Sequence, residues 1–223
     1  MRMRNVVARL LARLAVFTTE AAVLGLVFGA ALLLFFYLTR VVFVEKSAAL
    51  DSWAFQQMDA LRAAWPGLTP LARGITLFAS LPFLVAAGLL IPGGLARAGY
   101  RREAWEVLLA VAGSALFNQL LKVHYQRGRP LSALLPQPGL SFPSGHAMIG
   151  MALYGCLAWL LWRHARRPGW ALVLLGWALL IGLTRIYLHV HYATDVLAGF
   201  AAGLMWLALL RLVLEFNFHA QGK

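Results

Sequence analysis

Three short polar segments stand in an otherwise apolar sequence, and their residue types suit work on a phosphate group. They are Lys122 with Arg129 and Pro130, Pro143-Ser144-Gly145-His146, and Arg185 with His191 and Asp195. Cationic side chains offer several N–H donors to phosphate oxygens, and the planar fork of an arginine fits two of them at once. A histidine beside a carboxylate can act as a nucleophile, and a second histidine can carry a proton. The set therefore indicates a phosphate-handling site that does more than bind.

The second and third segments suggest how the groups are arranged. Pro143-Ser144-Gly145 precedes an apolar stretch, so Ser144 can cap the helix and Gly145 lets backbone N–H groups approach an anion at the positive end of the helix dipole. His146, in the first turn, then lies beside the same phosphate. His191 and Asp195 are four residues apart, which predicts one shared helix face and a hydrogen bond between them. The other imidazole nitrogen stays free to attack phosphorus.

The composition predicts a membrane protein. Of the 223 residues, 61% are hydrophobic and 13% are charged, whereas soluble domains carry about 25% charged residues. Six apolar stretches have the roughly 17 to 25 residues that a membrane-spanning helix needs. They lie at 18–39, 74–95, 104–123, 146–162, 169–187 and 192–213. We therefore expect an all-α polytopic bundle that forms one integral membrane domain over residues 1–223.

The connections between these stretches carry less information. The longest, Arg40 to Arg73, contains apolar residues at near-helical spacing between Asp51 and Arg62, which predicts a short amphipathic helix on the membrane that ends at Pro66-Gly67. The first apolar run, from Ala21 to Leu38, is longer than a signal-peptide core, so we expect a retained helix.

Lysine and arginine are distributed unequally between the two sides of the predicted bundle. The richer side, which also holds both termini, carries Arg2, Arg4, Arg9, Arg13, Arg97, Arg101, Arg102, Arg163, Arg166, Arg167, Arg211 and Lys223. Since positive residues favour the cytoplasm, we expect cytoplasmic termini and an outward-facing site. We interpret the net charge of +12 as this topology signal plus attraction to anionic lipid headgroups, not as nucleic-acid binding.

Helix lengths predict that the three segments share one depth. At 1.5 Å per residue, each lies about 26 to 30 Å from an arginine on the cytoplasmic side. A charged side chain at the bilayer centre costs about 2.5 to 3.5 kcal/mol even on the mildest scale, so three cations are better placed near the outer interface. There they face water or a bound anion.

The spacings K-x6-R-P, P-S-G-H and R-x5-H-x3-D resemble those of the type 2 phosphatidic acid phosphatase (PAP2) family, membrane lipid phosphatases related to vanadium haloperoxidases. The resemblance covers residues 122–195. It implies that His191 forms a phosphohistidine, that Asp195 orients His191, and that His146 is the general acid. It further implies a phosphate-binding set and no metal or other cofactor. That set is Lys122, Arg129, Ser144, Gly145 and Arg185. Thr184 stands where the family usually has serine.

Several alternatives stay open at this stage. Arg127 is either a solvated loop charge or part of the site, and His189 with His191 is not expected to form a metal pair. His124, His164, His189 and His219 are expected to be interfacial polar residues. A non-enzymatic lipid-phosphate or anion transporter would need the cations but neither His191 nor His146.

The expected substrate is a phosphorylated membrane lipid. Analogy favours undecaprenyl pyrophosphate or phosphatidylglycerol phosphate over phosphatidic acid or a lipid A phosphate. A lipid phosphotransferase or a lipid A phosphatase would use the same residues. Membrane lipids are the other expected partners, and the expected location is a bacterial inner membrane with the site facing the periplasm.

Overall fold

The computed structural model describes residues 2–220, with side chains placed from residue 19 to 215 apart from Ala165. All regular elements in these residues are helical, which confirms the all-α prediction. The elements are α1 (Arg2–Thr39), the π-helical turn η1 (Arg40–Val44), α2 (Ala49–Ala64), α3 (Leu68–Thr76), the 3-10 turn η2 (Leu77–Ala79), α4 (Leu81–Arg97), α5 (Arg101–Tyr125), α6 (Gly145–Ala165), α7 (Pro168–Tyr187) and α8 (Ala193–Ala220). Outside the described part lie Lys223 and the side chains of Arg2, Arg4, Arg9 and Arg13, which entered the orientation argument.

Among the described residues, five helices are long and apolar enough to cross a membrane, and a bent pair can supply a sixth span. The span expected at 74–95 corresponds to a bent helix pair, because α3 with η2 meets α4 at an angle of 43°. Ser80 at the break has an extended backbone (φ −66°, ψ 155°). Pro82 follows at the start of α4, where its missing N–H is tolerated, and so the chain restarts as a new helix in another direction.

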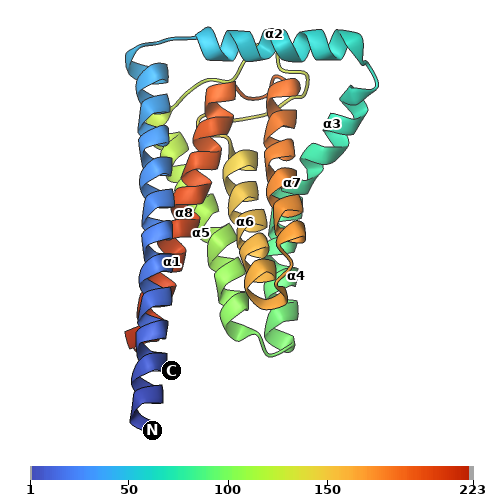
Figure 1. Cartoon of the computed structure of the whole chain (residues 1–223). Helices are drawn as coiled ribbons and strands as arrows, with labels where there is room; N and C mark the ends of the chain where they lie inside the picture. Colours follow the sequence, from blue (N-terminus) through green and yellow to red (C-terminus); the bar gives the residue numbers. More distant parts are fainter. Residues whose placement is uncertain (1, 221–223) are drawn as a thin grey trace.

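The amphipathic helix expected in the first long connection is α2, which lies across one end of the bundle (Figure 1). Its buried residues are Asp51 and Ala54, and Phe55 and Met58 also pack inward. Trp53 points away from the bundle and is 58% exposed. The inward face of α2 therefore contains a carboxylate as well as apolar side chains.

Two glycines let α8 approach the start of α6. A Cβ atom on Gly199 would lie 2.7 Å from the Ser144 carbonyl oxygen, and one on Gly203 would lie 2.6 Å from the Met148 carbonyl oxygen. Both distances are too short for a side chain. The Ser144 amide in turn donates a hydrogen bond of 2.9 Å to the Asp195 carbonyl oxygen. This contact joins the first turns of α6 and α8, and with them two of the predicted catalytic segments.

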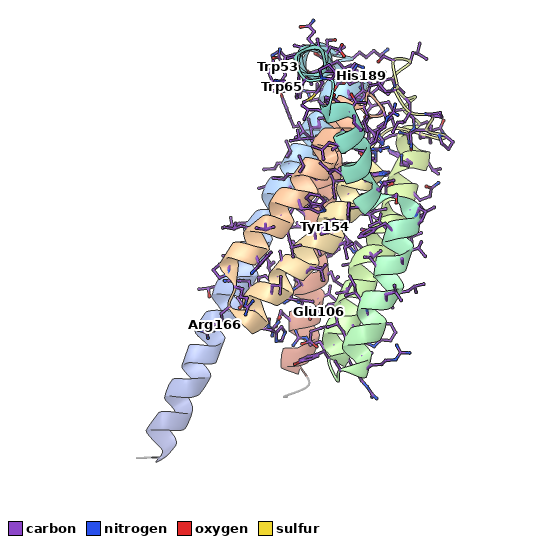
Figure 2. All side chains as sticks on the ribbon, turned by 90° about the vertical axis from the view of Figure 1, so that its right-hand side faces the viewer. Trp53, Trp65, Glu106, Tyr154, Arg166 and His189 are labelled. Carbon is purple, nitrogen blue, oxygen red and sulfur yellow. The ribbon has the colours of Figure 1, made fainter. Side chains whose placement is uncertain are left out.

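Charged residues also gather at the other end of the bundle. Glu106 is buried and accepts hydrogen bonds from Arg211 and, at 3.1 Å, from Arg102. Figure 2 shows Glu106 and Arg166 at this end, and Trp53, Trp65 and His189 at the end covered by α2. The α2 end and the arginine-rich end are thus separated along the helix axes, as the helix lengths predicted.

Candidate active site

His191 and Asp195 form a buried pair, with 3.4 Å between His191 Nδ1 and Asp195 Oδ2. The predicted pairing is present, but its expected cause is wrong, because His191 lies in the turn before α8 and not on the helix. Asp195 lies in the first turn of α8, where its Oδ2 accepts a 3.0 Å hydrogen bond from the Tyr192 amide. That contact satisfies an N–H group at the helix start, as in a capping box. The Asp195 carboxylate is therefore held at the helix terminus and in contact with the His191 imidazole.

The second imidazole nitrogen of His191 faces the cations. Its Nε2 lies 3.1 Å from Arg129 Nη1, which also donates a 2.8 Å hydrogen bond to the Val190 carbonyl oxygen. Burial lowers the pKa of His191 well below its usual value, and the charges of Arg129, Arg185 and Lys122 lower it further. The imidazole is therefore neutral at neutral pH. With its proton on Nδ1 toward Asp195, it presents a lone pair at Nε2.

Arg185 is the most buried of the three predicted phosphate-binding cations, with 1% of its surface exposed. Its Nη1 donates a 2.8 Å hydrogen bond to Thr76 Oγ1, while Nε and Nη2 have no hydrogen-bond partner among the described residues. A buried donor without a partner costs about 1 to 3 kcal/mol. An anion beside these two nitrogens would remove that cost. Lys122 is held nearby through a hydrogen bond from Nζ to the Leu140 carbonyl oxygen.

The segment Pro143 to His146 leads into α6, but Ser144 does not act as expected. Ser144 occupies the N-cap position, yet its hydroxyl makes no capping hydrogen bond, and its buried Oγ has no partner within the described part of the chain. A Cβ on Gly145 would lie 3.1 Å from Asn118 Oδ1, so the glycine makes room for that amide. His146 lies in the first turn of α6. The unpartnered Ser144 hydroxyl is available to a ligand.

Arg127 is not a solvated loop charge, because its side chain binds two buried carboxylates. Its Nη1 donates to Asp195 Oδ1 at 2.5 Å and to Thr194 Oγ1 at 2.7 Å. Its Nη2 donates to Asp51 Oδ2 at 2.8 Å. Asp51 also accepts hydrogen bonds of 2.9 Å from the Thr194 amide and hydroxyl. The guanidinium of Arg127 thus bridges α2 to the Asp195 carboxylate, which lies beside His191.

Sequence patterns did not identify Asp51 or Thr194 as part of the site. The available signal was a carboxylate, Asp51, near apolar positions of a predicted amphipathic helix that also carries Asp59, and the sequence alone names no partner for it. Asp51 is separated by 76 residues from Arg127 and by 143 from Thr194. Only the packing of α2 over the bundle end brings these residues together.

His189 is buried, although it was expected to be an interfacial polar residue. It is 4% exposed, its ring stacks on Phe55 with centroids 4.1 Å apart, and its Nδ1 lies 3.0 Å from Ser132 Oγ. Burial lowers its pKa. His189 therefore packs α2 against the loop that follows α5. Within the described residues no group of three or more His, Cys, Asp or Glu side chains could hold a metal ion.

A cavity of about 580 Å³ reaches the site from the side of the bent span. Its lining joins α3, η2 and α4 to the loop between α5 and α6 and to two predicted site residues. The lining residues are Arg73, Gly74, Thr76, Leu77, Ser80, Leu81, Pro82, Leu135, Gln137, His146 and Arg185. Leu77 and Leu81 are 60% and 73% exposed. The cavity thus connects charged groups to an apolar outer surface.

Comparison with known proteins gives consistent matches. The model of the PAP2 superfamily matches residues 103–218. Phosphatidylglycerophosphatase B of Bacillus subtilis (strain 168) is 31% identical over 184 residues, which cover 76% of this chain and 89% of the relative. A lipid A 1-phosphatase of Rhizobium johnstonii is 31% identical over 115 residues, covering 47% of this chain and 44% of that protein. The crystal structure of a transmembrane PAP2 type phosphatidylglycerolphosphate phosphatase from Bacillus subtilis superposes with a TM-score of 0.75 at 28% identity, covering 84% of this chain and 96% of that one.

Proposed function

Because this chain belongs to the PAP2 superfamily and is an integral membrane lipid phosphatase, we propose that it releases phosphate through a phosphohistidine at His191. The observation that carries this proposal is the buried His191–Asp195 pair close to three cations, which are Lys122, Arg129 and Arg185. Binding a phosphate requires only the cations. A neutral imidazole held by a carboxylate adds a nucleophile, which a transporter or binding protein does not need.

The first step transfers the phosphoryl group to the enzyme. His191 Nε2 forms a bond to phosphorus while the bond from phosphorus to the leaving oxygen breaks, and His146 gives that oxygen its proton. Asp195 stabilises the positive charge that develops on His191. Lys122, Arg129 and Arg185 neutralise the equatorial oxygens of the five-coordinate transition state, and the Ser144 hydroxyl and the Gly145 amide are further donors. The free Nε and Nη2 of Arg185 support this assignment.

The second step returns the enzyme to its starting state. Water attacks the phosphohistidine, His146 accepts the water proton, and the phosphorus–nitrogen bond breaks to release inorganic phosphate and neutral His191. The scheme draws its positive charge from protein side chains and routes no step through a metal. Phosphate release is therefore expected to persist in EDTA.

For the substrate we favour phosphatidylglycerol phosphate or undecaprenyl pyrophosphate, handled at the outer face of an inner membrane with both termini cytoplasmic. The printed name of the Bacillus relative supports the first lipid. The excess of arginine at the end opposite α2 supports the orientation. A phosphotransferase would use the same first step with a lipid hydroxyl in place of water.

The decisive experiment captures the intermediate. Purified protein is mixed with lipid labelled on its terminal phosphate. The reaction is quenched in alkali, because phosphohistidine persists there, and the protein is digested for mass spectrometry. We expect label on the peptide that contains His191, and steady-state phosphate release from a panel of the candidate lipids. His191→Ala should abolish both signals, whereas His124→Ala, an exposed histidine at the end of α5, should preserve them. Substantial turnover by His191→Ala would remove this residue as the nucleophile.

A further inference from the structure

The cavity that reaches His146 is larger than a transferred phosphoryl group requires. Its volume of about 580 Å³ is typical of cavities that hold whole organic ligands. Among its polar lining residues, Thr76 and Arg185 already bind one another, and His146 has a proposed catalytic role. Arg73 and Gln137 line the same cavity and have no part in the steps described above.

Arg73 is a cation without a partner in the described part of the protein. It lies in the last turn of α3, its side chain is exposed to the cavity, and no ion pair or hydrogen bond engages it there. Other arginines at this end are engaged, since Arg62 donates to the Tyr187 carbonyl oxygen and Arg40 pairs with Glu45. An exposed guanidinium that lines a partly apolar cavity and has no partner among the described residues attracts an anionic group of a ligand.

The chemistry of the proposed reaction indicates which part of the substrate lies in this cavity beside Arg73. In an in-line displacement, the attacking nitrogen and the leaving oxygen lie on opposite sides of phosphorus. His146 protonates the leaving oxygen, so the cavity lined by His146 receives the leaving group. Arg73 therefore acts on the part of the substrate that departs, and the exposed Leu77 and Leu81 continue from there toward lipid tails.

We propose that Arg73, assisted by the Gln137 amide, binds a second phosphate on the leaving side of the substrate, so that this enzyme prefers lipids whose leaving group is an anion. The inference rests on the proposed phosphatase function and narrows its substrate class. With phosphatidylglycerol phosphate the leaving group is phosphatidylglycerol, which keeps a charged phosphodiester. With a polyprenyl pyrophosphate the leaving group is a polyprenyl phosphate. With phosphatidic acid the leaving group is neutral diacylglycerol, which offers Arg73 no anionic group.

The test compares leaving groups in one enzyme. Phosphate release is measured for wild type, Arg73→Gln and Arg73→Lys with phosphatidylglycerol phosphate, a polyprenyl pyrophosphate, phosphatidic acid and dodecyl phosphate. Since a charge-assisted hydrogen bond contributes a factor of about 10 to 100, Arg73→Gln should lower kcat/KM that much for at least one of the first two lipids. It should change kcat/KM less than threefold for the two substrates with neutral leaving groups, and Arg73→Lys should restore part of the loss. Arg40→Gln, an exposed arginine at the same end, is the control for general attraction to anionic lipids.

The outcomes separate the two proposals. A loss confined to the diester-containing lipid, or to the pyrophosphate, supports the inference and names the source of the second phosphate. Equal losses for all four substrates, or no loss with any, overturn it even if wild type is active. A wild type that releases no phosphate from any of the four refutes the phosphatase function itself. Activity on dodecyl phosphate also reports that Arg73→Gln is folded.

Discussion

The imidazole of His191 lies between a carboxylate at Nδ1 and an arginine at Nε2. This arrangement fixes both its tautomer and its direction, since the proton on Nδ1 faces Asp195 and the lone pair on Nε2 faces Arg129 and the proposed phosphate site. Burial and three nearby cations disfavour the imidazolium in the free enzyme. A bound phosphate dianion reverses that balance, because it neutralises the cations and favours a positive imidazole. The proposed nucleophile is therefore neutral before attack, and its positive charge is stabilised after attack.

This balance predicts a ligand-dependent titration of His191. In nitrogen-15 NMR of histidine-labelled protein, the His191 signal should stay that of a neutral ring from pH 8 down to pH 6, because its pKa is lowered well below the usual value. Saturating vanadate or phosphate should raise the pKa of His191, so that protonation begins at higher pH. His191→Gln assigns the signal. A midpoint near the ordinary histidine value of about 6.5 in the free enzyme would contradict the electrostatic argument.

At the scale of elements, α2 is connected to the His191–Asp195 pair through Asp51, which binds Arg127. Arg127 shares its two terminal nitrogens between Asp51 on α2 and Asp195 on α8, so the position of Asp195 depends on a helix that lies across the bundle end (Figure 1). Both carboxylates are buried, and removing one partner leaves the others short of a hydrogen bond. We infer that Asp51 and Arg127 are positioning residues for the His191–Asp195 pair.

A double-mutant cycle tests this coupling. Asp51→Asn and Arg127→Gln should each lower kcat about 10-fold or more, and the double variant should lose less than the product of the two losses. Residues that act through one network show coupling of about 0.5 to 3 kcal/mol. The pH at which His191 protonates, measured by the same NMR signal, should shift in both variants, which a merely structural role would not cause. Glu45→Gln, an exposed carboxylate before α2, should behave as wild type. Strictly multiplicative losses would show that the two residues act separately.

The contact between α6 and α8 gives a prediction about stability. A methyl group on Gly199 would lie 2.7 Å from the Ser144 carbonyl oxygen and 2.9 Å from Ala147 Cβ, so Gly199→Ala must push the helices apart. Overpacking of this kind costs about 1 to 3 kcal/mol. The resulting shift of Ser144 away from Asp195 should also reduce kcat. Thermal unfolding in detergent and phosphate release measure the two effects.

The matched control is Gly176→Ala on α7, where nothing lies within 4 Å of the added Cβ. Alanine is a better helix former than glycine by about 0.5 to 1 kcal/mol, so this variant should be at least as stable as wild type. If Gly199→Ala matched it in both stability and kcat, the close approach of α8 to α6 would not be needed for the site.

Local patterns predicted some of these elements and missed others for physical reasons. Hydropathy identified the region 74–95 as membrane-spanning, but a sliding average carries no information about the bend at Ser80. The spacing of His191 and Asp195 predicted their contact, although the turn before α8 and not a shared helix face produces it. The bridge from Asp51 to Arg127 depends on packing between distant segments, which no local pattern encodes.

At the scale of the whole molecule, the bundle has two chemically different ends. The end under α2 holds the proposed site, with unpartnered donors and an open cavity. The opposite end holds mutually paired charges such as Glu106 with Arg211 and Arg102, and α1 begins and α8 ends on that side (Figure 1). Ion pairs there join α5 to α8, although Nε and Nη2 of Arg211 have no hydrogen-bond partner among the described residues. If the α2 end is the outer one, the proposed site faces outward and the ion-paired end faces the cytoplasm.

Thiol labelling tests which face is which. The single cysteine, Cys156, is buried, so Cys156→Ala gives a background without reactive thiols. Gln57→Cys places a thiol on the exposed side of α2, and Arg166→Cys places one at the opposite end (Figure 2). If arginine-rich segments stay in the cytoplasm, a membrane-impermeant maleimide should label Gln57→Cys in intact spheroplasts and Arg166→Cys only after permeabilisation. Phosphate release by each variant checks that the fold is intact. The reverse labelling pattern would place the site on the cytoplasmic face, where undecaprenyl pyrophosphate and phosphatidylglycerol phosphate would have to be reached from the inner leaflet.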